Sequence, residues 1–453
     1  MATLGTGGQA RRPKGRASER ARLEGAASRV EVPPACDVCV VGGGAAGLVA
    51  GIVAAEAGAR VVVLDRGAEC GRTILATGGG RCNLANRDLA ASRYLHPGFV
   101  AQAMGADPLA RVLAFFEESG LFLTEEEGRI YPKSLSAASV RDVLVARALR
   151  AGATLAPLRE TRLVRRVAGA RATDGSAGRL EVAFDELWAG GGWRSLRAGC
   201  VVLATGGTSS TAHVGAAGRG TARDAASHRL ELEGLAVPRV PLEPVLCPLA
   251  SDLAELACLD GRRVRCVATL ERDGKPLMSE AGEALFRAHG LSGIVSFDLS
   301  RKAKAGDVVA LDLVPGVAEG DVAASIRRLG ARVALDGMLD PEISVVLASM
   351  RQGAAPTARL AKRFEVPVTG LAETERAQVM RGGISVDALS PETLEACGEP
   401  GLFACGEAVD VDGPCGGYNL AWAWTSGMAA GSAAAREAKS KADAGEEGLG
   451  GRP

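Results

Sequence analysis

Short runs of apolar residues alternate with helical patterns near the start of the chain, beyond a polar, arginine-rich segment. The segment Asp37 to Val41 is apolar after its first residue, which indicates a strand buried on both faces. An alanine-rich helical pattern over Leu48 to Ala57 stops at Gly58, and Arg60 to Leu64 returns to a strand pattern. This order of strand, turn, helix and strand predicts a parallel βαβ unit and therefore an α/β fold.

Later segments predict an insertion followed by a return to the first domain. The spacing is mainly helical over about Asp107 to Leu158 and over about Val317 to Phe364. Alternating segments from about Pro238 to Leu313 predict a small antiparallel sheet or barrel, and glycine-rich α/β patterns resume from Gln378. We therefore expect a discontinuous Rossmann-like domain. The expected parts are a disordered basic tail (1–34), the first part of the nucleotide-binding domain (35–237), a β-barrel-like domain (238–316), a small helical domain (317–370), the second part of the nucleotide-binding domain (371–435) and a second disordered tail (436–453).

The turn of the first βαβ unit carries a dinucleotide fingerprint. Gly42 permits the tight turn, Gly44 lets the main chain approach a pyrophosphate, and Gly47 lets the helix pack closely against the strand. The N-terminus of that helix favours negative charge. Asp65, at the end of the second strand, is placed to accept the ribose hydroxyls of an adenosine. In this context the motif predicts FAD or NAD, and the alternative is a structural turn without a ligand.

Two further glycine-rich segments can contact the same ligand. The bare amides of the loop Thr73 to Asn83 can wrap a phosphate, a ribityl chain or a flat heteroaromatic ring. Arg81 and Asn83 then supply charge and amide hydrogen bonds, whereas a flexible surface loop is the alternative. The segment Val201 to Gly207 predicts a strand whose carboxyl end opens onto Ala-Thr-Gly-Gly, where ligands of open α/β sheets bind.

The C-terminal part holds a third such segment. Gly401 to Glu407 predicts a strand and a turn, followed by the acidic Asp410, the pair Gly416–Gly417 and a helix over Ala421 to Ala435. An acidic group beyond a strand end can accept ribityl hydroxyls, and a helix that begins near Asn419 can point free amides at the flavin N1–O2 edge. An ordinary solvated acidic loop is the alternative.

Composition narrows the class of function. The chain has 453 residues, enough for two or three domains, and its 53 Lys and Arg balance its 53 Asp and Glu. The chain therefore lacks the positive net charge that would favour binding to a nucleic acid. It also contains no stretch of about 18 uncharged apolar residues, which would indicate a membrane span. Eleven cysteines without zinc or disulfide spacing predict no metal site and a cytoplasmic protein. We expect a small-molecule substrate and no nucleic-acid or membrane partner, and the sequence leaves the oligomeric state open.

Together these segments resemble the BaiN-like, or YhiN-like, bacterial flavoproteins, also known as aminoacetone oxidase-like FAD-binding proteins. The resemblance covers about Cys36 to Gly431 and is most specific at Thr77 to Asn83 and at Gly416 to Leu420. It implies an FAD domain of the two-dinucleotide type with an inserted β-barrel and a small helical domain. It also implies oxidoreductase chemistry, with members linked to the reduction of bile-acid enones. The cofactor-binding residues predicted from the motifs and the resemblance are Gly42, Gly44, Ala45, Ala46, Gly47, Asp65, Arg66, Arg72, Gly79, Gly80, Arg81, Cys82, Asn83, Val167, Ala204, Thr205, Gly206, Gly406, Glu407, Asp410, Gly417, Tyr418, Asn419 and Leu420.

The chain departs from the family pattern in three places. Thr208 to His213 replaces a stretch that usually contains a tyrosine, Ile294 stands where a proline is usual, and Thr73 replaces a basic residue. We therefore expect its substrate preference to differ from that of better-known members.

The predicted function is that of an FAD-dependent oxidoreductase. A hydride would pass through flavin N5 between NAD(P)H or another donor and a small hydrophobic substrate, such as a steroid-like or bile-acid enone. NAD(P)H is expected as a transient reductant, because no second fingerprint unit is present. His289 can donate a proton if it faces the flavin, and a structural histidine is the alternative.

Three other functions are alternatives to this prediction. They are a flavin-dependent nucleic-acid-modifying enzyme, a non-catalytic flavin-binding protein and a flavoprotein disulfide reductase. Cys70 and Cys82 lack the CxxC or CxxxxC spacing of a redox pair, which disfavours the reductase. A packed Cys82 is the simpler interpretation.

Overall fold

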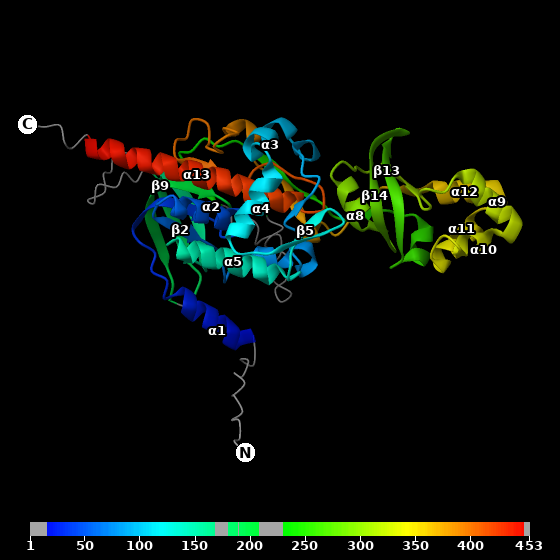
Figure 1. Ribbon diagram of the computed structural model, residues 1–453, viewed down its shortest axis with the longest axis horizontal. Helices are drawn as coiled ribbons and strands as arrows, with labels where there is room; N and C mark the ends of the chain where they lie inside the picture. The colour runs from blue at the N-terminus through cyan, green and yellow to red at the C-terminus, as the bar shows by residue number, and fades with distance from the viewer. Residues whose placement is uncertain (1–15, 168–179, 189, 208–229, 448–453) are drawn as a thin grey trace, which may run out of the picture.

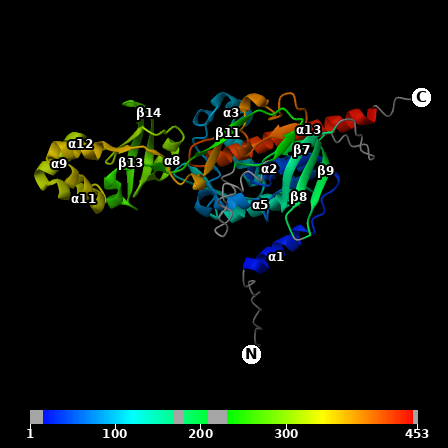
Figure 2. The ribbon, with the colours of Figure 1, turned by 180° about the vertical axis from the view of Figure 1, so that it is seen from behind.

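The computed structural model describes residues 16–167, 180–188, 190–207 and 230–447. The chain forms an elongated body with a larger lobe and a smaller lobe, which Figure 1 and the reverse view in Figure 2 both show. The larger lobe contains both the N-terminal and the C-terminal parts of the chain, and the smaller lobe is inserted between them.

The larger lobe is built on a mostly parallel sheet that confirms the predicted Rossmann-like α/β fold. Its central strand β1 (Ala35–Val41) pairs in parallel with β2 (Val61–Leu64) on one side and β9 (Trp193–Leu203) on the other. Strand β6 (Thr154–Ala156) extends the sheet beyond β2, and β20 (Leu402–Ala404) pairs in parallel with β9. The C-terminal part of the chain therefore completes a sheet that the N-terminal part begins.

An antiparallel extension joins this sheet through β9. Strand β8 (Leu180–Glu186) pairs antiparallel with β9 and with β7 (Arg159–Arg166), and β10 (Glu231–Glu233) pairs in parallel with β7. Strand β7 ends one residue before Val167, which is among the predicted cofactor-binding residues.

Helix–helix packing holds the two ends of the chain together. Helix α2 (Ala45–Glu56) follows the fingerprint turn, and α13 (Tyr418–Glu447) packs along it. A Cβ built on Gly431 would lie 2.4 Å from the Ala50 carbonyl oxygen, so this contact requires a glycine. The other elements of this lobe are α1 (Arg16–Ala27), η1 (Arg72–Gly80), β3 (Ala85–Asn86), η2 (Ala91–Arg93), α3 (Pro97–Met104), α4 (Pro108–Glu118), β4 (Leu123–Glu126), β5 (Arg129–Pro132), α5 (Ala137–Arg150), η5 (Val386–Ala388) and η6 (Gly406–Ala408).

The smaller lobe combines an antiparallel sheet with a group of helices. Its seven strands lie in the order β17-β16-β13-β14-β15-β12-β18. Helix α8 lies on the side that faces the larger lobe, and α9 to α12 lie at the far end (Figure 1). The elements are β12 (Leu249–Ala250), η3 (Ala254–Leu259), β13 (Arg263–Arg272), β14 (Lys275–Arg287), β15 (Gly290–Ser292), α8 (Ile294–Ser300), β16 (Val308–Asp312), α9 (Glu319–Leu329), α10 (Ala331–Asp336), α11 (Pro341–Met350), α12 (Ala354–Lys362), β17 (Phe364–Pro367), β18 (Gly370–Leu371) and η4 (Thr374–Arg376).

Two strands connect the lobes. The chain leaves the larger lobe through β11 (Arg239–Val245) and returns through β19 (Val379–Ile384), and these strands pair with each other. Each lobe has its own buried apolar cluster, one around β1, β2, β9, α2 and α13 and the other around β13, β16 and α9 to α12. The lobes therefore have separate cores.

Some local expectations were wrong. Residues 16–27, expected in a disordered tail, form α1, and Arg159 donates hydrogen bonds of 2.8 Å to the Ala27 oxygen and 2.7 Å to the Val30 oxygen just beyond it. Helix α13 continues to Glu447, past residue 435 where a second tail was expected. The stretch expected to be mainly helical also contains the β4–β5 hairpin. Residues 1–15, 448–453 and the departure at 208–213 lie outside the described residues.

Among the described residues, no single helix has both the length and the apolar character needed to cross a membrane. The bent pair of α3 and α4 meets that criterion only when the two helices are counted together.

Candidate cofactor site and the junction of the lobes

The fingerprint turn has the close main-chain contacts that its glycines predict. Gly42 has a φ of 106°, and a Cβ built on it would lie 2.2 Å from the Ala204 oxygen. A Cβ on Gly47 would lie 1.8 Å from the Gly42 oxygen. Ala204, Thr205 and Gly206 follow the end of β9, beside this turn. The turn, the start of α2 and the carboxyl end of β9 therefore meet where a pyrophosphate is expected.

Asp65 stabilises the same turn. Its carboxylate accepts hydrogen bonds from the Gly43 amide at 2.6 Å and the Gly67 amide at 2.5 Å. Burial raises the pKa of Asp65, and the two amides lower it. Arg66 pairs with Glu160 at 3.3 Å. Asp65 thus has a structural role in addition to its predicted contact with ribose.

The loop after β2 has exposed main chain at Gly79 and Gly80, followed by the fixed side chains of Arg81 and Cys82. Positions Gly79 and Gly80 are open, because a Cβ built on either would meet nothing within 4 Å. The Arg81 guanidinium lies 4.4 Å from the Tyr131 ring centroid and pairs with Glu126, so this side chain is held by the β4–β5 hairpin. Cys82 is fully buried, and burial raises the pKa of its thiol to about 12. The thiol therefore stays protonated near neutral pH, as expected of a packed cysteine.

The glycine-rich segments from the two ends of the chain converge. A Cβ on Gly406 would lie 2.7 Å from the Ala46 Cβ, and a Cβ on Gly417 would lie 2.8 Å from Asn83 Oδ1. Gly417 has a φ of 99°. Asn83 Oδ1 is buried, and no described residue donates a hydrogen bond to it. Segments more than 300 positions apart therefore enclose one region that contains an acceptor without a donor.

The acidic residues after β20 tie this region to the return strand β19. Glu407 accepts a hydrogen bond of 2.8 Å from the Met380 amide. Asp410 accepts one of 2.8 Å from the Gly382 amide through Oδ1, and its Oδ2 lies 3.2 Å from His96 Nε2. Sequence reasoning assigned His96 no role.

The start of α13 is braced by its own side chains. Asn419 Oδ1 accepts a hydrogen bond of 2.8 Å from the Gly413 amide, and its Nδ2 donates one of 2.9 Å to the Gly413 oxygen. The Tyr418 hydroxyl donates to the Asp88 oxygen at 3.0 Å. Half-buried Leu420 completes this first turn, whose amide groups have no acceptor within the helix.

The remaining predicted residues are less tightly connected to this region. Val167 is half-buried immediately after β7, and Arg72 begins η1. His289 is exposed between β14 and β15, where its main-chain oxygen accepts a hydrogen bond of 3.0 Å from the Ser251 amide. Its recorded contact lies within the smaller lobe, and its proposed proton transfer remains a prediction.

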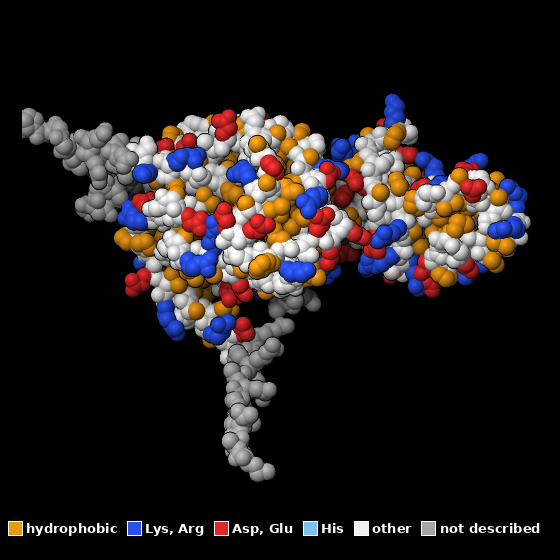
Figure 3. Space-filling model, viewed as in Figure 1, with side chains coloured by type: hydrophobic (Ala, Val, Ile, Leu, Met, Phe, Trp, Pro, Cys, Tyr) orange, Lys and Arg blue, Asp and Glu red, His pale blue; other side chains and the backbone are white. Residues whose placement is uncertain are grey.

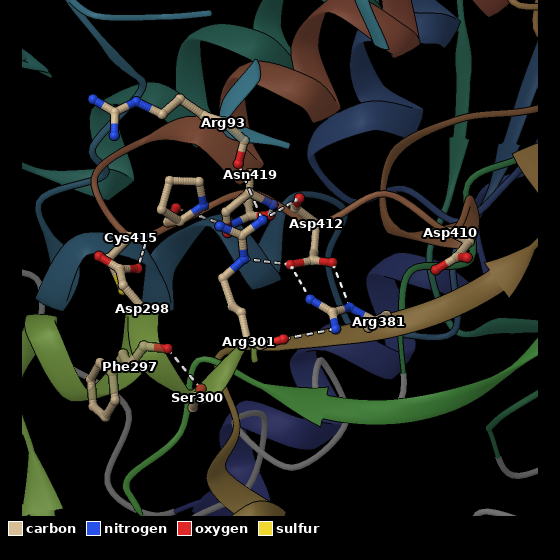
Figure 4. Close-up of polar contacts among 12 residues, drawn as sticks. Arg93, Phe297, Asp298, Ser300, Arg301, Arg381, Asp410, Asp412, Cys415 and Asn419 are labelled. Carbon is tan, nitrogen blue, oxygen red and sulfur yellow. Dashed lines mark hydrogen bonds and ion pairs between the residues drawn. The ribbon is translucent and has the colours of Figure 1, made fainter. Parts of the chain in front are cut away.

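A buried ionic cluster at the junction of the lobes was missed in the sequence (Figure 4). The Asp412 side chain is fully buried and accepts from Arg301 Nε at 2.6 Å and from Arg381 Nε at 2.8 Å. Arg301 also donates to the Asp412 main-chain oxygen at 3.1 Å. Burial acts to raise the pKa of Asp412, but the two guanidinium groups more than offset it and the pKa is lowered. The cluster joins the residue after α8, β19 and the loop before α13.

A second polar contact crosses the same junction. Asp298 of α8 accepts a hydrogen bond of 2.6 Å from the Cys415 amide, next to Gly416. Burial raises the pKa of Asp298 to about 6, and the charge of Glu280 adds to the effect. Side chains of both charge signs flank the notch between the lobes (Figure 3). Asp298 lies in a run without a motif, so one sequence offered no signal for it.

The described residues fit FAD. Gly42, Gly44 and Gly47 would hold its pyrophosphate, and the open loop at Gly79 and Gly80 leaves space for a flat ring. Asn83 Oδ1, which has no donor among the described residues, could accept a hydrogen bond from an N–H group of the flavin ring. The positive N-terminal end of α13 would suit the electron-rich edge of that ring.

Comparisons with known proteins agree with this arrangement. The sequence profile of the family described as "HI0933-like protein Rossmann domain" matches residues 36–433. The "3-dehydro-bile acid delta(4,6)-reductase" of Clostridium scindens is 30% identical over 427 residues, covering 87% of this chain and 98% of that protein. The "Ribosomal RNA dihydrouridine synthase" of Escherichia coli is 29% identical over 420 residues, covering 87% and 96%.

Similarity to solved structures is more distant. The 3-ketosteroid delta1-dehydrogenase of Sterolibacterium denitrificans aligns over 89% of this chain and 100% of that chain, with a TM-score of 0.45 and 13% sequence identity. This similarity is too low to support an argument about function.

Proposed function

The chain belongs to the HI0933-like Rossmann-domain family, and we propose that it is an FAD-dependent oxidoreductase that saturates a carbon–carbon double bond conjugated to a carbonyl group. The convergence of the Gly42–Gly47 turn, Asn83, Gly406 and Gly417 around one region carries this proposal. Bound FAD would supply two-electron hydride chemistry at N5.

The residues of the chain would position the cofactor and tune its charge. The main chain at Gly42 and Gly44 would contact the pyrophosphate, and Asp65 would contact the ribose next to the turn that it stabilises. The first turn of α13 would direct free amide groups toward the ring edge on which negative charge develops during reduction. Asn83 would accept a hydrogen bond from the ring.

The substrate proposed here is a small hydrophobic enone. The relative from Clostridium scindens is named for the reduction of a bile acid, and dihydrouridine synthesis likewise saturates a double bond next to a carbonyl. At the junction of the lobes, Val245, Leu246 and Val379 form a small apolar cluster, against which Phe297 and Cys415 pack. These three residues are buried, so an apolar substrate would contact the cluster through its partly exposed members Phe297 and Cys415. NAD(P)H as the reductant is part of the proposal.

The test begins with the cofactor and proceeds to the substrate. Purified protein should bind FAD, and anaerobic NADH or NADPH should bleach it. A 3-oxo-Δ4 steroid should then reoxidise it with the appearance of the saturated product. Gly417→Ala should abolish FAD binding, because its Cβ would meet Ala85 and Asn83 within 3 Å, whereas Gly98→Ala, in open space, should keep it. Wild-type protein that binds no FAD, or whose reduced flavin no enone reoxidises, would contradict the proposal.

A second candidate is reduction of uridine in ribosomal RNA. It is favoured by the 29% identity over 87% of this chain to the relative with that name. The equal numbers of acidic and basic residues, 53 each, argue against a general affinity for RNA. Incubating the reduced protein with unmodified ribosomal RNA and with the steroid, followed by mass spectrometry of both products, separates the two candidates.

A further inference from the structure

Cys415 and Asp298 face each other across the junction of the lobes. Asp298 comes from α8 of the smaller lobe and is 5% exposed, while half-buried Cys415 precedes the glycine pair at the start of α13. The Asp298 carboxylate accepts from the Cys415 amide at 2.6 Å (Figure 4), and its charge and hydrogen bonding also act on the Cys415 thiol. One carboxylate therefore holds the main chain at Cys415 and acts on its thiol.

This pair lies beside the predicted cofactor region and the apolar cluster. Asn86 Nδ2 donates to the Gly416 oxygen at 3.0 Å, and Gly417 contacts Asn83, whose Oδ1 is unpaired among the described residues. Cys415 also packs against the cluster of Val245, Leu246 and Val379. The thiol is therefore close both to the loop expected to contact the flavin and to the partly exposed edge of the apolar cluster, where the substrate is proposed to bind.

The charged groups around the pair favour a protonated thiol. Burial and then the charge of Asp298 raise the pKa of Cys415 well above its usual range, whereas Arg129 of β5 and Arg301 after α8 act in the opposite direction. Glu280 of β14 raises the pKa of Asp298, and burial raises the pKa of Glu280 itself. Tyr418 of α13 also interacts electrostatically with Asp298 and Glu280.

We propose that the Cys415 thiol donates the proton that accompanies hydride transfer to the substrate, and that Asp298 positions this thiol. The proposal rests on the proposed function. An enone needs both a hydride at its β-carbon and a proton at its α-carbon, and only a group close to the cofactor and the substrate can deliver that proton.

The atoms and electrons balance in this step. A hydride supplied by bound, reduced FAD would add to the β-carbon, and the π electrons of the double bond would move toward the carbonyl. The S–H bond of Cys415 breaks as its proton adds to the α-carbon, which leaves a thiolate that a solvent proton neutralises through Asp298. The substrate gains two electrons and two hydrogens, and a nicotinamide-type donor returns two electrons to the cofactor.

The first test uses protein without flavin and measures the thiol directly. Asp298→Asn removes the neighbouring negative charge, so iodoacetamide at pH 8 should alkylate Cys415 about tenfold faster than in wild type, because one pKa unit is a factor of ten. Peptide mass spectrometry follows each cysteine separately, and exposed Cys258 and Cys397 should react equally in both proteins. An unchanged rate at Cys415 would overturn the positioning role of Asp298.

A measurement on the wild type covers the case in which Asp298→Asn fails to fold. Alkylation of Cys415 should still accelerate between pH 9 and 11, because its thiol is protonated at pH 9. A rate that is already constant above pH 9 would show an unperturbed thiol and contradict the proposal.

The second test separates the two half-reactions of the FAD-loaded protein. Cys415→Ala should leave flavin reduction by NAD(P)H within about twofold of wild type but slow reoxidation by the enone about a hundredfold, the usual effect of losing a general acid. Cys415→Ser should recover part of the loss, and Cys258→Ala, at an exposed position in η3 of the smaller lobe, should change neither rate.

Two outcomes of this second test would contradict different claims, one the proton-donor role of Cys415 and the other the proposed function. Equal slowing of both half-reactions in Cys415→Ala would overturn the proton-donor role. If no enone reoxidises even the wild-type flavin, the proposed function fails instead, and the alkylation experiment still tests the Asp298–Cys415 pair.

Discussion

The cofactor region of the larger lobe and the junction with the smaller lobe are assembled from different parts of the chain. The cofactor region is shaped by main chain, since added methyl groups at Gly42 and Gly47 would overlap carbonyl oxygens. The junction is held by side chains, with Asp412 accepting from Arg301 and Arg381. Contacts of the first kind require glycines at fixed spacing, whereas contacts of the second kind require only that three charged groups meet in space.

The largest effect should come from the main-chain contacts. Gly47→Ala places a Cβ 1.8 Å from the Gly42 oxygen, where neither β1 nor α2 can shift without disturbing the sheet. We expect no soluble protein with bound FAD, measured by expression yield and flavin absorbance. Gly98→Ala, in α3 with open space around its Cβ, should fold normally and gain up to about 1 kcal/mol from helix propensity. A soluble, yellow Gly47→Ala protein would show that the turn is more adaptable than this geometry allows.

The buried ionic cluster should give the next largest effect. Asp412→Asn leaves two largely buried guanidinium groups without their carboxylate, for an expected loss of about 3–5 kcal/mol in the free energy of unfolding. Urea unfolding followed by circular dichroism measures this loss. Asp336→Asn, which breaks an exposed pair with Arg332 on α10, is the matched control and should cost less than about 0.5 kcal/mol. Equal losses in the two variants would remove the distinction between buried and exposed pairs.

The sequence predicted the main-chain contacts far better than the side-chain contacts. Gly42, Gly47 and Gly417 could be identified because only glycine fits where two main-chain segments touch. The required glycines therefore form a motif with fixed spacing, which is visible in a single sequence. The acidic residue Asp412 stood in a recognised segment, but nothing in the sequence indicated that Arg301 and Arg381 would reach it. Pairing of residues far apart depends on how the lobes dock, which local patterns do not encode.

The histidines show the same limit of local patterns. His289, which precedes a glycine-rich turn, lies exposed between β14 and β15, and its predicted role is untested. His96, in a segment without a motif, lies 3.2 Å from Asp410. A lone histidine acquires its role from its partner, and the partner is set by tertiary structure.

The next effect in size should be a pH dependence of the free energy of unfolding, caused by Asp298 at the junction of the lobes. The folded-state pKa of Asp298 is raised to about 6 from 3.8, so the folded protein binds more protons than the unfolded chain between these values. The contribution of Asp298 to stability should be fully present below pH 4 and fall by about 2–3 kcal/mol as the pH rises to 6, at about 1.4 kcal/mol per pKa unit. Urea unfolding of wild type and Asp298→Asn across this range isolates the effect. If the difference between the two proteins stays constant with pH, Asp298 does not titrate as proposed.

The smallest effect should come from an exposed counterpart of the Asp412 cluster. Arg363 pairs with Glu271 and Glu365 at 2.7 Å each, so it has two partners of opposite charge, as Asp412 has. Its side chain is 47% exposed, however, whereas that of Asp412 is fully buried. Water and salt screen Arg363 and Glu365, and only the Glu271 side chain, 13% exposed, is largely covered. Arg363→Gln should therefore cost about 1 kcal/mol, and 0.5 M salt should reduce the cost further. A loss close to that of Asp412→Asn would mean that the number of partners, and not burial, sets the strength of these clusters.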